Sequence, residues 1–174
     1  MNELALFEAN PTEHRGAVIS DCGRYRYRLD RTWDAALPVA TFVMLNPSTA
    51  DAEVDDPTIR RCLGYAHTWG CGALTVVNLY AWRATDPREL AACTDPIGPG
   101  NDLYLAAAAK SATASGGPLV AAWGAHAAPE RIAEVVALPG MRHLTALALT
   151  KSGQPRHPLY LKANLAPQPW RNAA

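Results

Sequence analysis

The sequence has few charged residues and no excess of either sign. Asp, Glu, Lys and Arg make up 18 % of the 174 residues, and 16 basic residues balance 16 acidic ones. Soluble domains usually contain about 25 % charged residues. Tight binding of nucleic acid through overall charge is not expected, because it needs an excess of Lys and Arg at the phosphates. Any nucleic-acid function must therefore depend on a local site.

Long apolar runs are missing as well. None approaches the roughly 18 residues that a membrane-spanning helix needs. The N-terminal segment MNELALFEANPTEH places acids where a secretory signal has basic residues, and it lacks the longer apolar stretch of such a signal. The sequence therefore predicts a cytoplasmic protein without a membrane partner.

Closely spaced cysteines are a third absence. The four cysteines stand at Cys22, Cys62, Cys71 and Cys93, with no CxxC pair. In a reducing compartment this pattern favours free thiols over disulfides. The spacing also differs from that of the ligands in zinc sites and iron–sulfur clusters. We therefore expect no metal and no other cofactor.

The segments that are present fit a single α/β domain over residues 1–174. The length and the 49 % apolar content allow one substantial hydrophobic core. Two short runs around Asp21-Cys22-Gly23 predict an N-terminal β-hairpin at about 15–33. Four apolar runs that alternate with helical segments predict a central, four-stranded, mostly parallel sheet flanked by helices, at about 38–165. The expected strands are Val39–Leu45, Ala73–Leu79, Leu119–Trp123 and Leu144–Thr150, and the expected helices are Pro57–Thr68, Asp102–Ala114 with Asn101 as N-cap, and Pro129–Leu138.

Arginines alternate with tyrosines in the second strand of the hairpin. Arg24, Arg26 and Arg28 are separated by Tyr25 and Tyr27. The two-residue period of a strand puts all three arginines on one side. We expect a solvated face of the sheet there, with a DNA contact or a dimer edge as the alternatives, although the protein is otherwise expected to be a monomer.

Polar, turn-rich segments follow each of the four expected strands. In an open α/β sheet the ligand site lies outside the carboxyl ends of the strands, so we expect these segments to form one. Their polar and aromatic residues are Asn46, Ser48, Thr49, Asp51, Asp55, Asp56, Asn78, Tyr80, Trp82, Arg83, Lys151, Arg156 and His157.

Most of these residues also have a purely structural explanation. Asn46 precedes a proline and fits a turn, and His157 fits a turn cap. Asp55 and Asp56 fit the N-terminus of a helix. The tryptophans fit the core, and the basic residues fit solvated surface. Asn78 is harder to explain in this way, because an amide at the end of an apolar strand needs partners from the backbone or from a ligand.

The order of four short motifs resembles the uracil-DNA glycosylase superfamily. NPS follows the first core strand, VVNLYAWRA covers the second, VAAWGAHA covers the third, and a loop with His157-Pro158 comes late. The resemblance runs from about Val39 to Leu161. The local signature NPSTAD, DPTIRRC and PRHPLYL also resembles a bacterial and phage family of uncharacterised domains.

The resemblance implies a monofunctional, metal-independent DNA glycosylase, a hydrolase of base excision and DNA repair. Its substrate would be uracil or another deviant or modified base, flipped out of the DNA. Asn46 falls on the position that orients the hydrolytic water, Asn78 on the position that reads the base, and His157 on the position that stabilises negative charge on the departing base. The remaining expected contacts are Pro47, Ser48 and Tyr80 around the base, and Arg83, Lys151, Ser152 and Arg156 at the phosphates of the DNA.

The sequence departs from the superfamily at several of its positions. Asn46 is an amide and cannot act as a general base, so slow turnover is expected unless a carboxylate assists. Ser48 stands where the uracil-specific branch has an aromatic residue that excludes thymine. HPLYL replaces the usual HPSP in the loop that carries the wedge between the DNA strands. The residues expected to compensate are Asp51, Asp55 or Asp56 for the carboxylate and Leu159 or Tyr160 for the wedge.

Two further hypotheses compete with the glycosylase. A binding module on the same fold would recognise a base or nucleotide without cleaving it, which the neutral charge and the missing Asp favour. An enzyme that acts on free nucleotides or nucleosides is the other alternative, since it would not need a basic surface.

Overall fold

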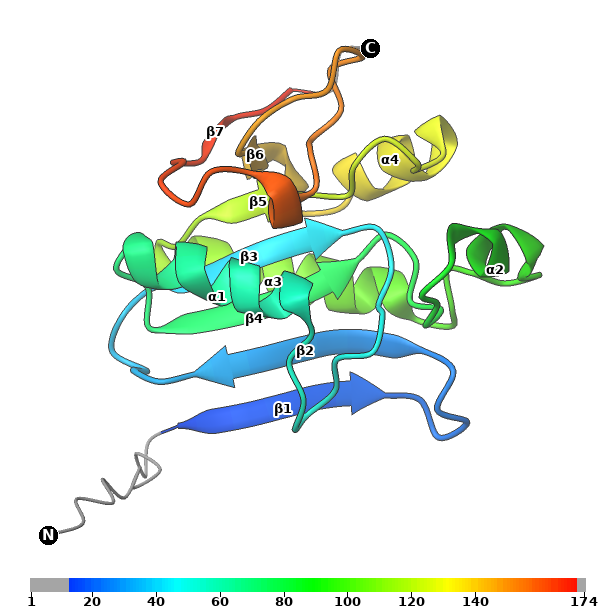
Figure 1. Ribbon diagram of the computed structural model, residues 1–174, viewed down its shortest axis with the longest axis horizontal. Coiled ribbons are helices and arrows are strands. Elements are labelled where there is room, and N and C mark those ends of the chain that lie inside the picture. The colour runs from blue at the N-terminus through cyan, green and yellow to red at the C-terminus, as the bar shows by residue number, and fades with distance from the viewer. Residues whose placement is uncertain (1–12, 172–174) are drawn as a thin grey trace, which may run out of the picture.

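The computed structural model describes residues 13–171 and has a mixed α/β fold built on one seven-stranded sheet (Figure 1). The strands are β1 His14–Ile19, β2 Arg26–Thr32, β3 Val39–Met44, β4 Ala73–Asn78, β5 Leu119–Ala121, β6 Thr145–Ala146 and β7 Gln168–Pro169. The helices are α1 Pro57–Thr68, α2 Pro87–Ala92, α3 Asn101–Ser115 and α4 Pro129–Val136, with the 3-10 helices η1 Met141–His143 and η2 Pro158–Tyr160.

Four parallel strands occupy the middle of the sheet, and antiparallel strands extend it on both sides. The strand order is β1-β2-β4-β3-β5-β6-β7. β3 is parallel to β4 and β5, and β5 is parallel to β6. β2 is antiparallel to β4, and β7 is antiparallel to β6. The prediction of a four-stranded sheet is therefore wrong, because the N-terminal hairpin pairs with β4 and a short C-terminal strand pairs with β6.

Helices cover both faces of the middle strands. α1 lies on one face of the sheet and α3 on the other (Figure 1). Phe42 of β3 packs in the same cluster as Ile59 and Tyr65 of α1, whereas the next residue, Val43, packs in the cluster that contains Leu105 of α3. Burial on both faces explains the uninterrupted apolar runs of β3 and β4.

The helices begin close to where the sequence predicts. α1 has the predicted bounds, with Pro57 in its first turn and the Asp56 carboxylate as N-cap. α3 begins one residue early, because Gly100 precedes it with a φ of 74°, so the prediction of Asn101 as N-cap is wrong. The Asn101 amide instead donates hydrogen bonds to two carbonyls at the end of β4. α4 is two residues shorter at its end than predicted, and α2 was not predicted.

The last predicted strand, Leu144–Thr150, is much shorter than expected. The loop with His157-Pro158 therefore leaves the sheet and lies near the carboxyl ends of the other strands. β6 covers only Thr145–Ala146, and β5 ends at Ala121. After β6 the chain leaves the sheet and η2 packs against α1. The Tyr65 hydroxyl of α1 donates a hydrogen bond of 2.6 Å to the carbonyl of Lys162, which holds this segment in place.

The hairpin departs from a regular two-residue alternation. Its register shifts between Val18 and Ile19, opposite the start of β2. Arg26 is buried, Tyr27 stacks on Tyr104 of α3, and Arg28 pairs with Asp30 of the same strand. The expectation of one solvated face with all three arginines is therefore wrong for Arg26.

Within residues 13–171, no helix has the length and apolar character needed to cross a membrane. All four cysteines are free, and Cys62 and Cys71 are buried. Across the same residues, no group of three or more His, Cys, Asp or Glu side chains is placed to hold a metal ion.

Candidate functional site

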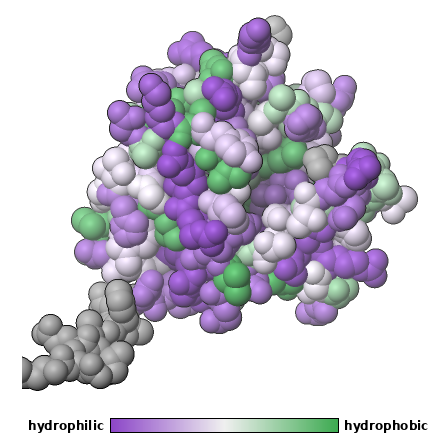
Figure 2. Space-filling model, viewed as in Figure 1, coloured by the Kyte–Doolittle hydropathy of each residue, from purple (hydrophilic) through white to green (hydrophobic). Residues whose placement is uncertain are grey.

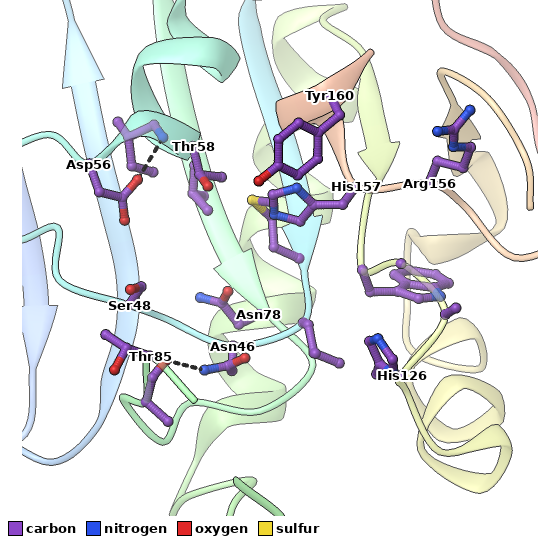
Figure 3. A pocket seen from close by; sticks show the side chains of 18 of the residues that line it. Asn46, Ser48, Asp56, Thr58, Asn78, Thr85, His126, Arg156, His157 and Tyr160 are labelled. Carbon is purple, nitrogen blue, oxygen red and sulfur yellow. Dashed lines mark hydrogen bonds between the residues drawn. The ribbon is translucent and has the colours of Figure 1, made fainter. Parts of the chain in front are cut away.

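A pocket of about 410 Å³ lies at the carboxyl ends of β3, β4 and β5. In the space-filling view, hydrophilic residues border a hollow next to these strand ends (Figure 2). Its walls come from the segments after β3, β4 and β5, from the start of α1 and from the loop that leads into η2 (Figure 3). The volume falls in the range of small-molecule sites. The pocket therefore lies where the order of strands and helices predicts one.

Asn78 is the last residue of β4 and has an unusual environment. The residue is 1 % exposed, and within residues 13–171 neither its amide nitrogen nor its amide oxygen has a hydrogen-bond partner. In Figure 3 the amide is directed into the pocket. A buried polar group without a partner destabilises the protein by about 1–3 kcal/mol. The backbone explanation for Asn78 thus fails, and a ligand would supply the missing partners.

Asn46 follows β3 and is held by its amide nitrogen. Nδ2 donates hydrogen bonds to the carbonyls of Pro47, at 3.0 Å, and of Ala84, at 2.9 Å. These two bonds stabilise the turn, as the structural explanation for Asn46 requires. They also fix the orientation of the amide, so that the oxygen is the side that is left to accept a hydrogen bond. Within residues 13–171, Oδ1 of Asn46 has no partner, and it is available to a water or ligand in the pocket.

His157 caps the start of η2 and faces the pocket. Its Nδ1 accepts a hydrogen bond from the Leu159 N–H at 3.3 Å, so the neutral ring carries its proton on Nε2. Burial lowers the pKa of His157 below its ordinary value, and the charge of Asp56 opposes this effect. The ring is therefore neutral at neutral pH. Its Nε2–H is a hydrogen-bond donor for a ligand that does not add a positive charge.

The lowered pKa of His157 predicts a pH-dependent stability. Below the ordinary pKa of 6.5, the unfolded chain binds protons that the folded chain excludes. The free energy of unfolding is therefore expected to fall as the pH drops from about 6.5 toward the lower pKa of the folded protein. His157→Gln should remove this part of the loss. Urea unfolding of both proteins at about pH 7.5 and about pH 5.5 measures it, and an equal loss in both proteins would contradict the prediction.

The three aspartates expected to assist at the site have different partners. The Asp51 carboxylate accepts hydrogen bonds from the Glu53 and Val54 N–H groups, which lower its pKa, and it does not line the pocket. Asp55 forms salt bridges with two arginines. Asp56 lines the pocket, and one of its oxygens caps α1. The prediction thus fits the geometry for Asp56 and not for Asp51, whose side chain closes its own turn.

Several other predicted residues lie outside the pocket. Pro47 is buried, and Tyr80 packs in the cluster on the α3 side of the sheet, where its hydroxyl accepts a hydrogen bond from the Ala128 N–H. Arg83 lies in a separate hollow and donates to the carbonyl of Gly23. Lys151 and Ser152 are exposed in a turn beyond Thr150 and do not line the pocket. The predicted residues that do line it are Asn46, Ser48, Asp56, Asn78, Arg156, His157 and, at the rim, the wedge candidate Tyr160.

The sequence analysis missed Arg26, Thr58, Thr85 and His126 as lining residues. Arg26 is the most unexpected of these, because the residue is only 2 % exposed. Its Nη1 donates to the carbonyl of Ala50, and burial lowers its pKa to about 10, which leaves it charged at neutral pH. The register shift of the hairpin, which turns Arg26 inward, has no signal in the sequence.

The fold and the site define an α/β protein with a polar ligand pocket at the carboxyl ends of its parallel strands. The chain belongs to the family described as "Protein of unknown function (DUF1643)", whose family model matches residues 26–159. The matched segment includes every pocket-lining residue named above except Tyr160 at the rim. A search of curated proteins and a search of solved structures gave no match.

Proposed function

We propose that the pocket binds a flipped-out nucleobase and that the protein is a metal-independent DNA glycosylase similar to the uracil-DNA glycosylase superfamily. The observation that carries the proposal is the buried, unpartnered amide of Asn78 beside His157 and Asn46 in one pocket. The substrate is DNA that contains uracil or another deviant or modified base. Arg156, exposed at the rim, is available to a phosphate of the DNA.

Asn78 suits the reading of one edge of a base. A primary amide offers both a hydrogen-bond donor and an acceptor. A uracil ring offers a carbonyl oxygen next to an N–H group, which is the complementary pair. Because the amide of Asn78 has no other partner, such a base forms both bonds without displacing a bond within the protein.

His157 and Asn46 suit the hydrolysis step. When the N-glycosidic bond breaks, its electron pair stays on the base and the sugar carbon becomes cationic. The neutral Nε2–H of His157 stabilises the negative base oxygen, and Asn46 Oδ1 orients the water whose oxygen bonds to the sugar carbon. One proton of that water leaves, and the base anion takes up one proton.

Water activation is the weak part of this site. Asn46 cannot take a proton, and Asp56 is the one carboxylate among the pocket-lining residues of the described chain. One oxygen of Asp56 is engaged as the cap of α1. Slow turnover is therefore expected, and single-turnover conditions are the appropriate assay.

The test is a single-turnover assay with excess protein. The oligonucleotide panel carries uracil, hypoxanthine, xanthine, mismatched thymine and hydroxymethylated bases, and alkali-labile abasic sites are scored. We expect cleavage of at least one substrate and its loss in Asn46→Ala. If Asn46→Ala and His157→Ala both leave base release unchanged, the proposal is contradicted.

A binding module is the second candidate, favoured by the lack of a general base at Asn46. It predicts tight binding to base-modified DNA without abasic product in the same assay. An enzyme for free nucleotides predicts competition by mononucleotides and none by oligonucleotides. The panel with these two competitors separates the three functions.

A further inference from the structure

Arg26 differs from the other buried arginines of the described chain in its partners. Three arginines are less than 5 % exposed: Arg26 at 2 %, Arg31 at 3 % and Arg131 at 4 %. Arg31 pairs with Asp55 at 2.8 Å, and Arg131 pairs with Asp102 and Glu134. Within residues 13–171, Arg26 has no salt bridge, and its Nε–H has no hydrogen-bond partner.

Burial disfavours the charged guanidinium of Arg26 and outweighs the favourable charges of Asp56 and Asp51, neither of which forms a salt bridge with it. A further counter-ion is therefore expected at Arg26. The guanidinium lines the same pocket as Asn78. The charged side chains that line this pocket are Arg26, Arg156 and Asp56, which leaves one positive charge in excess, because His157 is neutral. The pocket is therefore locally cationic in a chain whose overall net charge is zero.

Arg26 and Arg156 lie at different depths in the pocket, so they are expected to contact different parts of a ligand. Arg156 is exposed and meets groups at the mouth, whereas Arg26 is almost fully buried in the wall. A phosphate of a DNA strand that passes over the mouth reaches Arg156 first. Arg26 is available to the part of the ligand that enters the pocket beside the base.

We propose that the ligand carries a negatively charged oxygen group into the pocket, where it pairs with the guanidinium of Arg26. This inference rests on the proposed nucleobase site, but it does not require base release. The group is the phosphate of an inserted nucleotide or a carboxylate on a modified base. Guanidinium binds both groups through two parallel N–H bonds.

The experiment compares neutral and anionic ligands on the full-length protein. Isothermal titration measures each deoxynucleoside, including deoxyuridine, against its 5′-monophosphate, and uracil against 5-carboxyuracil. At low salt, at least one anionic ligand is expected to bind roughly 10- to 100-fold tighter than its neutral partner. The ligand pair that shows this gain in affinity tells whether Arg26 binds a phosphate or a carboxylate. Arg26→Met should abolish the gain, and Arg26→Lys should retain part of it.

A spectroscopic measurement keeps the test independent of variants that fold poorly. Arginine Nε–H signals are followed by NMR in the wild-type protein during addition of inorganic phosphate. The Arg26 signal should shift in a saturable way, whereas the Arg131 signal, whose Nε–H is bonded to the Leu79 carbonyl, should stay in place.

Two outcomes would overturn the inference. One is that no anionic ligand binds better than its neutral partner and phosphate leaves the Arg26 signal unmoved. The other is that the gain survives Arg26→Met and is lost in Arg156→Met, which would place the anion at the mouth. If the protein releases a base but binds no anionic ligand more tightly than its neutral partner, only this inference is rejected. If an anionic ligand binds more tightly but no base is released, only the glycosylase proposal is rejected.

Discussion

Asn78→Leu is expected to lower base release by roughly 30- to 10⁴-fold without destabilising the protein. The amide of Asn78 has no partner in the part of the chain that the structure describes, so leucine, which has a similar shape, removes no hydrogen bond seen in the fold. The base would instead lose two hydrogen bonds, at about 1–3 kcal/mol each, and 1.36 kcal/mol corresponds to a tenfold change in rate. Single-turnover base release and urea unfolding measure the two effects.

Asn101→Leu is the matched control, because Asn101 is the other buried asparagine among residues 13–171. Its Nδ2 donates hydrogen bonds of 3.0 and 3.2 Å to the carbonyls of Asn78 and Leu79. Its replacement should lower the free energy of unfolding by about 1–3 kcal/mol, because it removes both hydrogen bonds. An equal destabilisation by Asn78→Leu would mean that Asn78 has a structural role, and it would remove the main support for the base site.

His157→Ala is expected to lower base release by roughly 10²–10³-fold, the usual effect of losing one donor to a developing negative charge. The Nε2–H of His157 is the donor in question, since Nδ1 accepts the Leu159 N–H bond. His157→Ala should mainly lower the single-turnover rate at saturating protein and should change DNA binding less, because the negative charge on the base develops only as the glycosidic bond breaks.

His126→Ala controls for a general effect of losing a histidine from the pocket wall. His126 also lines the pocket, but it is exposed, and it lies on the segment between β5 and α4. Base release in this variant should stay within a few-fold of the wild-type value. A loss as large as that of His157→Ala would contradict the specific role of His157, and an unchanged rate in His157→Ala would contradict the mechanism.

Local patterns predicted the central elements and the general location of the site. The apolar runs of β3 and β4 and the Asp56-Pro57 start of α1 are properties of neighbouring residues, which the sequence displays directly. Because parallel strands share one carboxyl edge, residues that follow different strands were expected to meet. Asn46, Asn78 and His157 do line one pocket. Their catalytic roles remain a proposal.

The failures of the sequence analysis have specific physical causes. Asp51 was expected to be catalytic, but its carboxylate satisfies two N–H groups of its own turn. Tyr80 follows β4 just after Asn78, yet its side chain packs on the opposite side of the sheet from α1. The residue type of a polar side chain and its position in the sequence do not show which hydrogen-bond or packing partner it has in the folded protein.

The sequence by itself determined an α/β protein of ordinary domain size, its main strands and helices, and the strand ends at which polar residues gather. These features follow from hydrophobic periodicity and capping, which act over a few residues. Only the tertiary structure decided that the hairpin joins the main sheet, that Arg26 turns into the pocket and that η2 packs on α1 beside the strand ends. The physical reason is that strand register and the burial of a charge depend on contacts between segments far apart in the chain.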